Sequence, residues 1–475
     1  MNTLFGQPLK VVNCGLASFA DNLRRAGGEV EHVSWQPPAL GDLEAGLDLA
    51  YLMRHPLVEQ ANETAFARYL EAQPVLCDIV TASDAIRAMN ERKLILHSGP
   101  PIAWVNMCGP VQGAIIGAVM LEGWAADHAA AERLVLDGKI DLEPCHHYDA
   151  VGPMAGIISP SMPLFVVENK RNGHRTYCNF NEGLGKVLRF GANSEEVLTR
   201  LRWMKSTLAP ALKAALRVSG EIDLKPLMAQ ALHMGDEVHN RNSAATGLFI
   251  KRIMPALLEV DLPLAQIREV SAAIIGNDHF FLNISMAACK SMMDAAANVP
   301  FSSMVSVMAR NGVNFGIRLS GTGDQWFQAR ANPVEGLFFP GYGVDDAAAD
   351  LGDSAITETA GVGGFAMASS PAIVKFVGGT PADATANSRR MQAITLGGNP
   401  AFTLPALDFA PTAAGIDARK VADRRILPVI NTGIAHKRAG VGQIGAGITT
   451  APMECFVDAI RALASAVRQH TGQTS

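Results

Sequence analysis

Several features that mark whole classes of protein are missing from this 475-residue sequence. Charged residues make up only 18% and form no basic stripe, whereas a nucleic-acid groove needs clustered Lys and Arg to displace counterions. The chain does not open with a basic stretch followed by an apolar one. Its longest uncharged run, residues 94–121, is interrupted by His97, Pro100, Pro101, Asn106 and Gln112. We therefore expect a cytoplasmic protein that binds neither nucleic acid nor membrane.

The usual cofactor signatures are also missing. The seven cysteines are scattered without a CxxC pair, so their spacing predicts no zinc site. The turn after the first predicted strand reads NCGLAS, which is not the GxGxxG that a dinucleotide requires. The glycine-rich stretch at residues 352–364 lacks the Lys-Ser/Thr pair of a Walker A loop. We expect no organic cofactor and no metal.

What the chain has in plenty is apolar surface. Hydrophobic residues make up 48% of it, which is high for a chain without membrane spans. Large cores or a buried interface between copies must absorb this surface, and the length allows two or three domains. Both explanations fit the composition, and we expect a homo-oligomer.

Strands alternating with helices over the first hundred residues predict a parallel sheet with both faces covered. The strands are expected at residues 10–14, 29–35, 74–80 and 93–97. We predict an α/β fold in four parts. These are an N-terminal Rossmann-like parallel-sheet domain at 1–98, a Gly/Pro-rich α/β segment at 99–192 that joins the main domain, a helical block at 193–298, and a C-terminal mixed α/β region at 299–475.

The helical block is predicted from its periodicity. Val197, Leu201, Met204 and Leu208 recur at helical spacing, and Pro210 should end or kink that helix. The next helices are expected near residues 224–235, 241–258, 263–275 and 279–297. The last of these is apolar nearly all round, which predicts a central position.

A polar cluster at residues 234–242 is the first candidate site. On a helix, Asp236 would share a face with Asn240, and Glu237 with Arg241. We expect Arg241 to pair with Glu237 or with an anionic ligand inside the protein. The alternative is an exposed, salt-bridged turn, but the apolar residues at 244–250 would carry the cluster inward.

The glycine-rich stretch at 352–364 is the second candidate site. Gly361, Gly363 and Gly364 would let successive N–H groups converge on an anion, and a helix beginning near Phe365 would aim its positive end at it. The two threonines and the glutamate just before them, Thr357, Thr359 and Glu358, strengthen the phosphate interpretation. A turn without a ligand is the alternative.

A third candidate follows the apolar run at residues 426–430, which we predict to be a buried strand. Polar groups at the carboxyl end of such a strand lie where parallel sheets bind ligands. Asn431, His436 and Lys437 are therefore predicted to reach the same cleft as the glycines at 361–364. The alternative is a capped turn with a solvated lysine.

Long strings in fixed order show a family resemblance. They run from about residue 10 to residue 458 and resemble the YlbE/AllG family: VVNCGLASFADNLRRAGGEVEHVSWQPP, MCGPVQGAIIGAVMLEGWA, AVGPMAGIISPSMP, NEGLGKVLRFGAN, QALHMGDEVHNRN, GDSAITETAGVGGFAMA, NPAFTLPALDF and LPVINTGIAHKRAGVGQIGAG. The resemblance implies a subunit of a carbamoyltransferase in anaerobic allantoin breakdown. With FdrA-like and AllH-like subunits, it would interconvert oxalurate plus phosphate with oxamate plus carbamoyl phosphate, or act on a close ureido or acyl analogue.

Two alternatives stay open. The first is a non-catalytic scaffold for an FdrA-like partner, and the second is a relative of acyl-CoA ligases. For carbamoyl transfer itself, the chemistry suggests roles for the candidate residues. Phosphate needs backbone N–H groups or cations, the carbamoyl oxygen needs hydrogen-bond donors, and the amide nitrogen of oxamate needs a base. We assign binding of substrate and phosphate to Asn240, Arg241, Thr357, Thr359, Gly361, Gly363, Gly364, Asn431 and Lys437, and catalysis to His239, Glu358 and His436.

Overall fold

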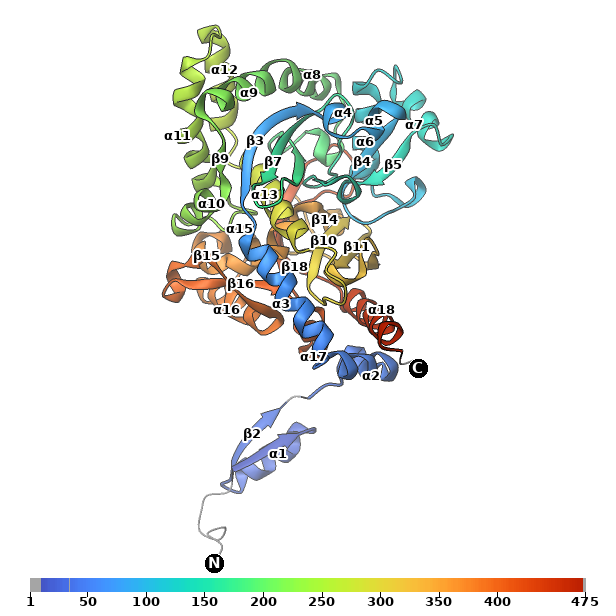
Figure 1. Cartoon of the computed structure of the whole chain (residues 1–475), viewed down its shortest axis with the longest axis vertical. Helices are drawn as coiled ribbons and strands as arrows, with labels where there is room; N and C mark the ends of the chain where they lie inside the picture. The colour runs from blue at the N-terminus through green and yellow to red at the C-terminus, as the bar shows by residue number, and fades with distance from the viewer. Residues whose placement is uncertain (1–9, 34, 473–475) are drawn as a thin grey trace, which may run out of the picture.

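The computed structural model describes residues 10–33 and 35–472. Its first unit consists of strand β1 (Lys10–Cys14), helix α1 (Ala17–Arg25) and strand β2 (Glu29–Val33). The two strands pair in parallel, with Lys10 opposite Glu29. This βαβ unit projects from the rest of the molecule, which we call the body (Figure 1).

The elements of the body follow in this order. Its first part contains α2 (Leu43–Leu52), α3 (Pro56–Glu71), β3 (Pro74–Thr81), α4 (Ala82–Ala85), α5 (Ala88–Glu91), β4 (Leu94–His97), α6 (Gly109–Leu121), α7 (His128–Leu136), β5 (Asp141–Pro144), β6 (Ala150–Val151), β7 (Pro163–Asn169) and β8 (Arg175–Asn179). The middle part contains α8 (Glu195–Trp203), α9 (Ala209–Ser219), β9 (Ile222–Asp223), α10 (Leu224–His233), α11 (Ser243–Glu259), α12 (Leu264–Ile275) and α13 (Leu282–Ala295). The last part contains β10 (Val305–Asn311), β11 (Asn314–Leu319), β12 (Phe327–Arg330), β13 (Glu335–Phe338), β14 (Leu351–Gly352), α14 (Ile356–Thr359), α15 (Val374–Val377), α16 (Pro381–Met391), β15 (Thr395–Leu404), β16 (Ala410–Ile416), α17 (Ala418–Arg424), β17 (Val429–Ala435), β18 (Gln443–Thr450) and α18 (Met453–Thr471).

A five-stranded sheet with the order β6-β8-β7-β3-β9 lies in the upper part of the body (Figure 1). Strand β3 pairs antiparallel with both β7 and β9, and β7 pairs antiparallel with β8. Helix α13 packs against this sheet, and every residue from Leu282 to Met293 is buried. The central position predicted for this helix from its apolar sequence is confirmed.

The last part of the chain forms antiparallel sheets. One has the order β12-β11-β10-β14, a second has the order β13-β18-β17, and β15 pairs with β16. Helix α18 packs against α2 and α17, so the C-terminal helix lies beside the first helix of the body (Figure 1). Antiparallel pairing needs only short connections, and it places neighbouring segments of the chain side by side.

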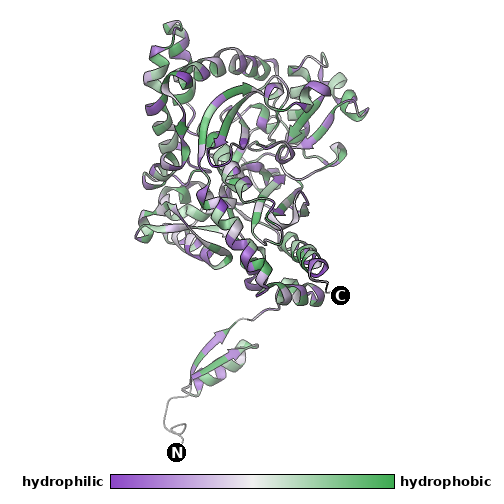
Figure 2. Cartoon of the chain, viewed as in Figure 1, coloured by the Kyte–Doolittle hydropathy of each residue, from purple (hydrophilic) through white to green (hydrophobic). Residues whose placement is uncertain are grey.

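The two largest hydrophobic cores of the described residues share one helix. Helix α3 contributes to both, with Val58 in the smaller core and Ala61 and Tyr69 in the larger one. The strands at the centre of the body are mostly hydrophobic, whereas the outer helices alternate in polarity (Figure 2). The hydroxyl of Tyr69 donates to the carbonyl of Ala360 at 2.7 Å, so α3 also fixes the glycine-rich stretch.

The mixed α/β class is confirmed, but the Rossmann-like layout of residues 1–98 is wrong. All four predicted strands form, yet they belong to three different sheets. Only β1 and β2 pair with each other in parallel, β3 lies inside the antiparallel part of the five-stranded sheet, and β4 pairs with β5. An apolar run predicts a strand without predicting its neighbour. The four part boundaries stay predictions, although the five-stranded sheet takes strands from the first three parts.

The helical block agrees closely with its prediction. Helix α8 passes through a π-helical turn at Met204–Leu208 into α9, where Pro210 lies in the first turn. Helical dihedral angles continue through Leu208, so the run does not end before Pro210, and the π-helical turn lies just before the proline. Helices α10, α11, α12 and α13 begin and end within three residues of the predicted limits.

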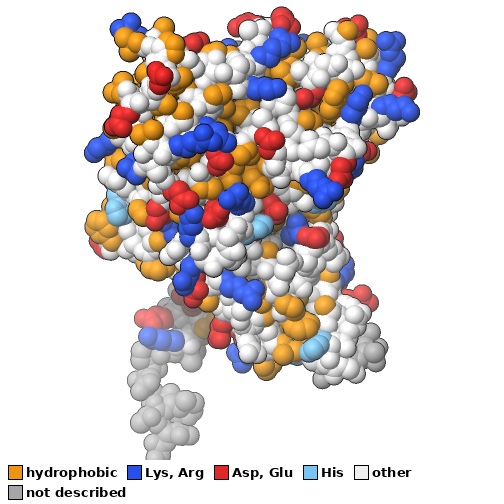
Figure 3. All heavy atoms as spheres, turned by 45° about the horizontal axis from the view of Figure 1, so that its top comes forward, with side chains coloured by type: hydrophobic (Ala, Val, Ile, Leu, Met, Phe, Trp, Pro, Cys, Tyr) orange, Lys and Arg blue, Asp and Glu red, His pale blue; other side chains and the backbone are white. Residues whose placement is uncertain are grey.

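Charges of both signs are interspersed with hydrophobic side chains on the face of the molecule shown in Figure 3. Among the residues that the structure describes, no helix is both long and apolar enough to cross a membrane.

The last residue of β4 predicts a pH dependence of stability. His97 is fully buried, and burial lowers its pKa from 6.5 to about 4. Its neutral form is therefore favoured by folding, and this stability is present above the unfolded pKa and lost as pH falls through the folded pKa. We expect wild type to lose about 2 kcal/mol more than His97→Gln between about pH 7.5 and about pH 5.

Urea unfolding of both proteins at the two pH values measures this difference. Glutamine keeps a donor for the carbonyl of Ser98, which accepts from the His97 ring at 2.8 Å, but it does not titrate in this range. Equal losses in the two proteins would show that His97 does not carry the pH dependence.

Candidate functional site

The glycine-rich stretch at 352–364 is buried in the middle of the body. It leaves β14, turns into the short helix α14, and enters a 3-10 helix at Gly363–Ser369. The side chain of Glu358, on α14, has no exposed surface. A carboxylate in that position is costly unless other groups compensate it.

The carboxylate of Glu358 is surrounded by donors. His239 Nδ1 lies 2.8 Å from Oε1 and 3.0 Å from Oε2. The N–H groups of Gly364 and Asn431 donate to Oε1 at 2.8 and 3.3 Å, and the hydroxyl of Thr357 lies 3.0 Å from Oε2. Histidine and two backbone N–H groups thus compensate the buried carboxylate.

The glycine N–H groups do not converge on one anion as predicted, because each of them has its own acceptor within the protein. The N–H groups of Gly361 and Gly363 donate to the carbonyls of Glu358 and Glu237, and that of Gly364 donates to the Glu358 carboxylate. The anion held by the turn is therefore Glu358. Gly363 has a φ of +58°, and a Cβ there would lie 2.3 Å from Glu358 Oε1. A glycine is needed at this position because any side chain would displace the carboxylate.

The segment at 236–242 is a loop rather than the helix on which the predicted pairing relied. Val238 has a φ of +68°, which breaks a helix, and the buried carboxylate of Glu237 closes the loop. It accepts from the N–H of His239 at 2.8 Å and from that of Arg241 at 2.6 Å. Burial raises the pKa of Glu237 to about 8. The loop holds His239 against Glu358.

Arg241 pairs with a different carboxylate from the one predicted. Its Nε lies 3.5 Å from Asp236 Oδ1, and Glu237 accepts only its backbone N–H. The other oxygen of Asp236 accepts from the N–H of Ala245 in the first turn of α11 at 2.8 Å, which fixes the start of that helix. The Arg241 side chain is 34% exposed, so part of the guanidinium is free to meet a ligand.

The sequence also misplaced the end of the strand that carries Asn431. Strand β17 continues to Ala435 and pairs antiparallel with β18, so Asn431 lies inside the strand. Its side chain is buried, and neither its oxygen nor its nitrogen has a hydrogen-bond partner in the described structure. Such a group is normally bonded, so it marks a position where a ligand or a water is expected.

His436 and Lys437 lie elsewhere. His436 accepts from the N–H of Arg438 at 2.9 Å and approaches Asp346, and Lys437 donates to the carbonyl of Asp345. Five residues of extended chain from Asn431 correspond to roughly 16 Å. The prediction that both side chains reach the cleft of the glycine turn is wrong, because it assumed that β17 ended five residues earlier.

The threonines of α14 are both buried and bonded locally. The hydroxyl of Thr357 donates to the carbonyl of Ser354 at 2.7 Å, and that of Thr359 to the carbonyl of Ala355 at 2.8 Å. Thr357 remains beside Glu358, whereas Thr359 points its hydroxyl back into its own helix turn. Of the predicted site residues, the structure thus brings together His239, Glu358, Thr357, Asn431, Gly363 and Gly364.

A pocket of about 360 Å³ opens beside the loop that carries His239. It is lined mainly by polar side chains, including Asn240, Arg241, Asn242, Asn277, His279 and Gln443. The nitrogen of the Asn240 amide is buried without a partner in the described structure. Burial, together with the nearby charges of Arg189 and His239, lowers the pKa of His279 to about 4. Asn240 lines the pocket and directly follows His239 in the chain, so the pocket adjoins the loop that holds His239 against Glu358.

A second polar centre was missed by the sequence analysis. Lys290 and Asp294 lie on α13 and form an ion pair of 2.6 Å, although the helix is apolar nearly all round. A charged pair four residues apart on a buried helix is a signal that sequence alone offers. Asp294 approaches His174, and His174 approaches Asp149. No spacing pattern in the sequence connects these residues.

The chain resembles known proteins in both sequence and fold. The sequence model of the family described as "Oxamate carbamoyltransferase subunit AllG" matches residues 140–354. The chain is 48% identical over 412 residues to the oxamate carbamoyltransferase subunit AllG of Escherichia coli (strain K12), which covers 86% of this chain and 98% of that protein. It is 46% identical over 461 residues to the uncharacterized protein YahG of the same organism, covering 96% of this chain and 98% of YahG.

A solved structure is also similar to this chain in fold and sequence. The crystal structure of a conserved protein of unknown function from Enterococcus faecalis V583 superimposes with a TM-score of 0.85 at 46% identity, covering 86% of this chain and 98% of that chain. The resemblance drawn from the sequence strings is confirmed. The identity to AllG extends over most of both proteins, and the chain belongs to the AllG family.

Proposed function

We propose that this chain provides a carbamoyl-transfer site in a complex of the oxamate carbamoyltransferase type. The reaction would interconvert oxalurate plus phosphate with oxamate plus carbamoyl phosphate, or use a close ureido or acyl analogue. One observation carries the proposal: a buried histidine, His239, is held by the buried carboxylate of Glu358, and the residues that follow it in its loop line a pocket of amides and one guanidinium. A base held by a second group is how enzymes activate a weak nucleophile.

The pocket suits a small molecule with a carboxylate next to an amide. Arg241 matches the planar shape of a carboxylate, which a guanidinium can bind through two parallel bonds. The amides of Asn240, Asn277 and Gln443 offer both donors and acceptors, as the amide or ureido part of oxamate or oxalurate requires.

In the direction of oxalurate formation, the amide nitrogen of oxamate attacks the carbamoyl carbon of carbamoyl phosphate. The new C–N bond forms, the bond from carbon to the bridging phosphate oxygen breaks, and phosphate leaves with that electron pair. His239 takes the proton from the nitrogen and returns it to the departing phosphate. Glu358 holds the ring through Nδ1, so Nε2 is the atom that exchanges the proton.

Charge develops on the carbamoyl oxygen while the bond forms. The amide nitrogen of Asn431 is a donor without a partner in the described structure and lies beside Glu358, so we assign this oxygen to it. The glycine N–H groups already have acceptors within the protein, so cationic side chains must bind the phosphate instead. We assign these to FdrA-like and AllH-like partner subunits, in keeping with the name of the E. coli relative as a subunit.

Substitution of the dyad tests the proposal. In the complex assembled with its partners, His239→Gln should lower kcat for oxamate release from oxalurate and phosphate by roughly 10²–10⁴-fold, because the base is lost. Glu358→Gln should have a similar effect, since an amide N–H facing Nδ1 favours the tautomer that carries its proton on Nε2.

The control is His233→Gln, at an exposed histidine that is hydrogen-bonded to Thr403. It should leave kcat unchanged. All three variants should keep wild-type assembly, measured by size-exclusion chromatography. Wild-type activity of His239→Gln in an intact complex would refute the assignment.

Arg241→Lys tests the carboxylate site. Lysine keeps the charge but cannot form two parallel bonds, so KM for oxalurate should rise about 10–100-fold while kcat changes little. The matched control is Arg252→Lys, because Arg252 is exposed and donates to the carbonyl of Ser219. An unchanged KM for Arg241→Lys would show that Arg241 serves only to pair with Asp236.

A further inference from the structure

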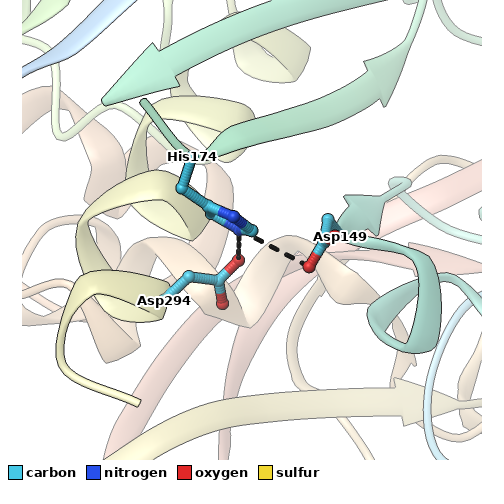
Figure 4. Close-up of side chains that lie close together, drawn as sticks. All are labelled: Asp149, His174 and Asp294. Atoms are coloured by element: carbon cyan, nitrogen blue, oxygen red, sulfur yellow. Dashed lines mark hydrogen bonds and ion pairs between the residues drawn. The ribbon is translucent and has the colours of Figure 1, made fainter. Parts of the chain in front are cut away.

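Three side chains from distant parts of the chain meet at the second polar centre. Asp149 lies between the 3-10 turn at Cys145–Tyr148 and β6, His174 lies in the turn between β7 and β8, and Asp294 is in the last turn of α13. The three side chains point toward one another (Figure 4). His174 Nε2 lies 3.3 Å from Asp294 Oδ2 and 3.5 Å from Asp149 Oδ1, and the three ligand atoms all lie within 4.8 Å of one another.

These distances suit a metal ion. Zinc binds histidine nitrogen and carboxylate oxygen at about 2.0–2.2 Å, which places the ligand atoms of a tetrahedral site about 3.4 Å apart. Two carboxylates and one imidazole leave a fourth position open, as in catalytic rather than structural zinc sites. His174 is 36% exposed and Asp149 52%, so an ion can reach them from solvent.

Neighbouring groups hold the ligands in place. Lys290 donates to Asp294 Oδ1 at 2.6 Å and leaves Oδ2 facing His174. The turn that carries His174 is fixed by Asn172, whose side chain accepts the N–H of His174 at 3.0 Å. Partners of this kind orient metal ligands and are found around most metal sites.

The adjoining pocket gives an independent sign of a ligand. It measures about 500 Å³ and is lined by Asp149 and Asp294 together with Lys290, Arg318 and His146. The side chain of His146 is completely buried. Its Nε2 lies 3.8 Å from Asp353 Oδ1, and neither ring nitrogen has a hydrogen-bond partner in the described part of the chain. A buried imidazole that lines a pocket and has no hydrogen-bond partner is expected to contact a bound molecule.

We propose that Asp149, His174 and Asp294 bind a divalent transition-metal ion of the zinc type. Its open position takes an oxyanion from the pocket, and Arg318 and Lys290 lie on the pocket wall to meet the negative charge. The site is separate from the dyad of His239 and Glu358, so the proposal does not rest on the proposed transferase function.

Metal titration of the purified full-length chain, after dialysis against a chelator, tests this directly. Isothermal titration with Zn²⁺ should show one site per chain. Asp149→Asn and His174→Gln, each of which removes one partly exposed ligand, should weaken it about tenfold or more. Co²⁺ should give the visible absorption of a four-coordinate site in wild type and lose it in both variants.

Asp324→Asn is the matched control. Asp324 lines the same pocket and pairs with Arg318, but it is 89% exposed and lies outside the three ligands. It should bind Zn²⁺ as wild type does. Absence of binding in wild type would show that the three side chains form only an ion-pair cluster. Equal binding in wild type and in both ligand variants would place the metal elsewhere. Either result would overturn the proposal.

Discussion

The buried carboxylate of Glu358 is the constraint on which the arrangement of the site depends. A charge without exposed surface must be compensated, and its donors come from a loop, a glycine turn and a strand that are far apart in sequence. His239 reaches it only because Glu237 closes the loop, and the N–H groups arrive only because Gly363 has no side chain. The loop closed by Glu237 and the glycine at position 363 are therefore both required to hold the Glu358 carboxylate in place.

Helix α13 connects the two polar centres. Near its start, Ser285 donates to the carbonyl of Val238 at 3.2 Å, in the loop that carries His239. At its end, Lys290 and Asp294 contribute to the proposed metal site. A buried helix is rigid because it is packed on all sides, so it fixes the distance between the two centres. The family fold therefore provides one pocket of amides and one of charged groups on a shared support.

Much of this could be predicted from the sequence, and the failures have a common cause. Helices α10 to α13 follow from periodicity, and the choice of His239, Glu358 and the glycines as candidate residues follows from polar clusters beside apolar runs. Strand pairing depends on tertiary contacts, so the antiparallel position of β3 and the full length of β17 were not predictable. The wrong position predicted for His436 follows from the error in the length of β17. Asp149, His174 and Asp294 share no spacing, and only the folded chain brings them together.

The central claim is that the complex transfers a carbamoyl group to phosphate, and the dependence of oxalurate cleavage on phosphate tests it most directly. Oxamate release would be measured in the complex assembled with its partners, with and without phosphate, together with the formation of carbamoyl phosphate. The account predicts equal amounts of oxamate and carbamoyl phosphate, and no turnover without phosphate. Equal turnover in phosphate-free buffer would mean hydrolysis and would contradict the account.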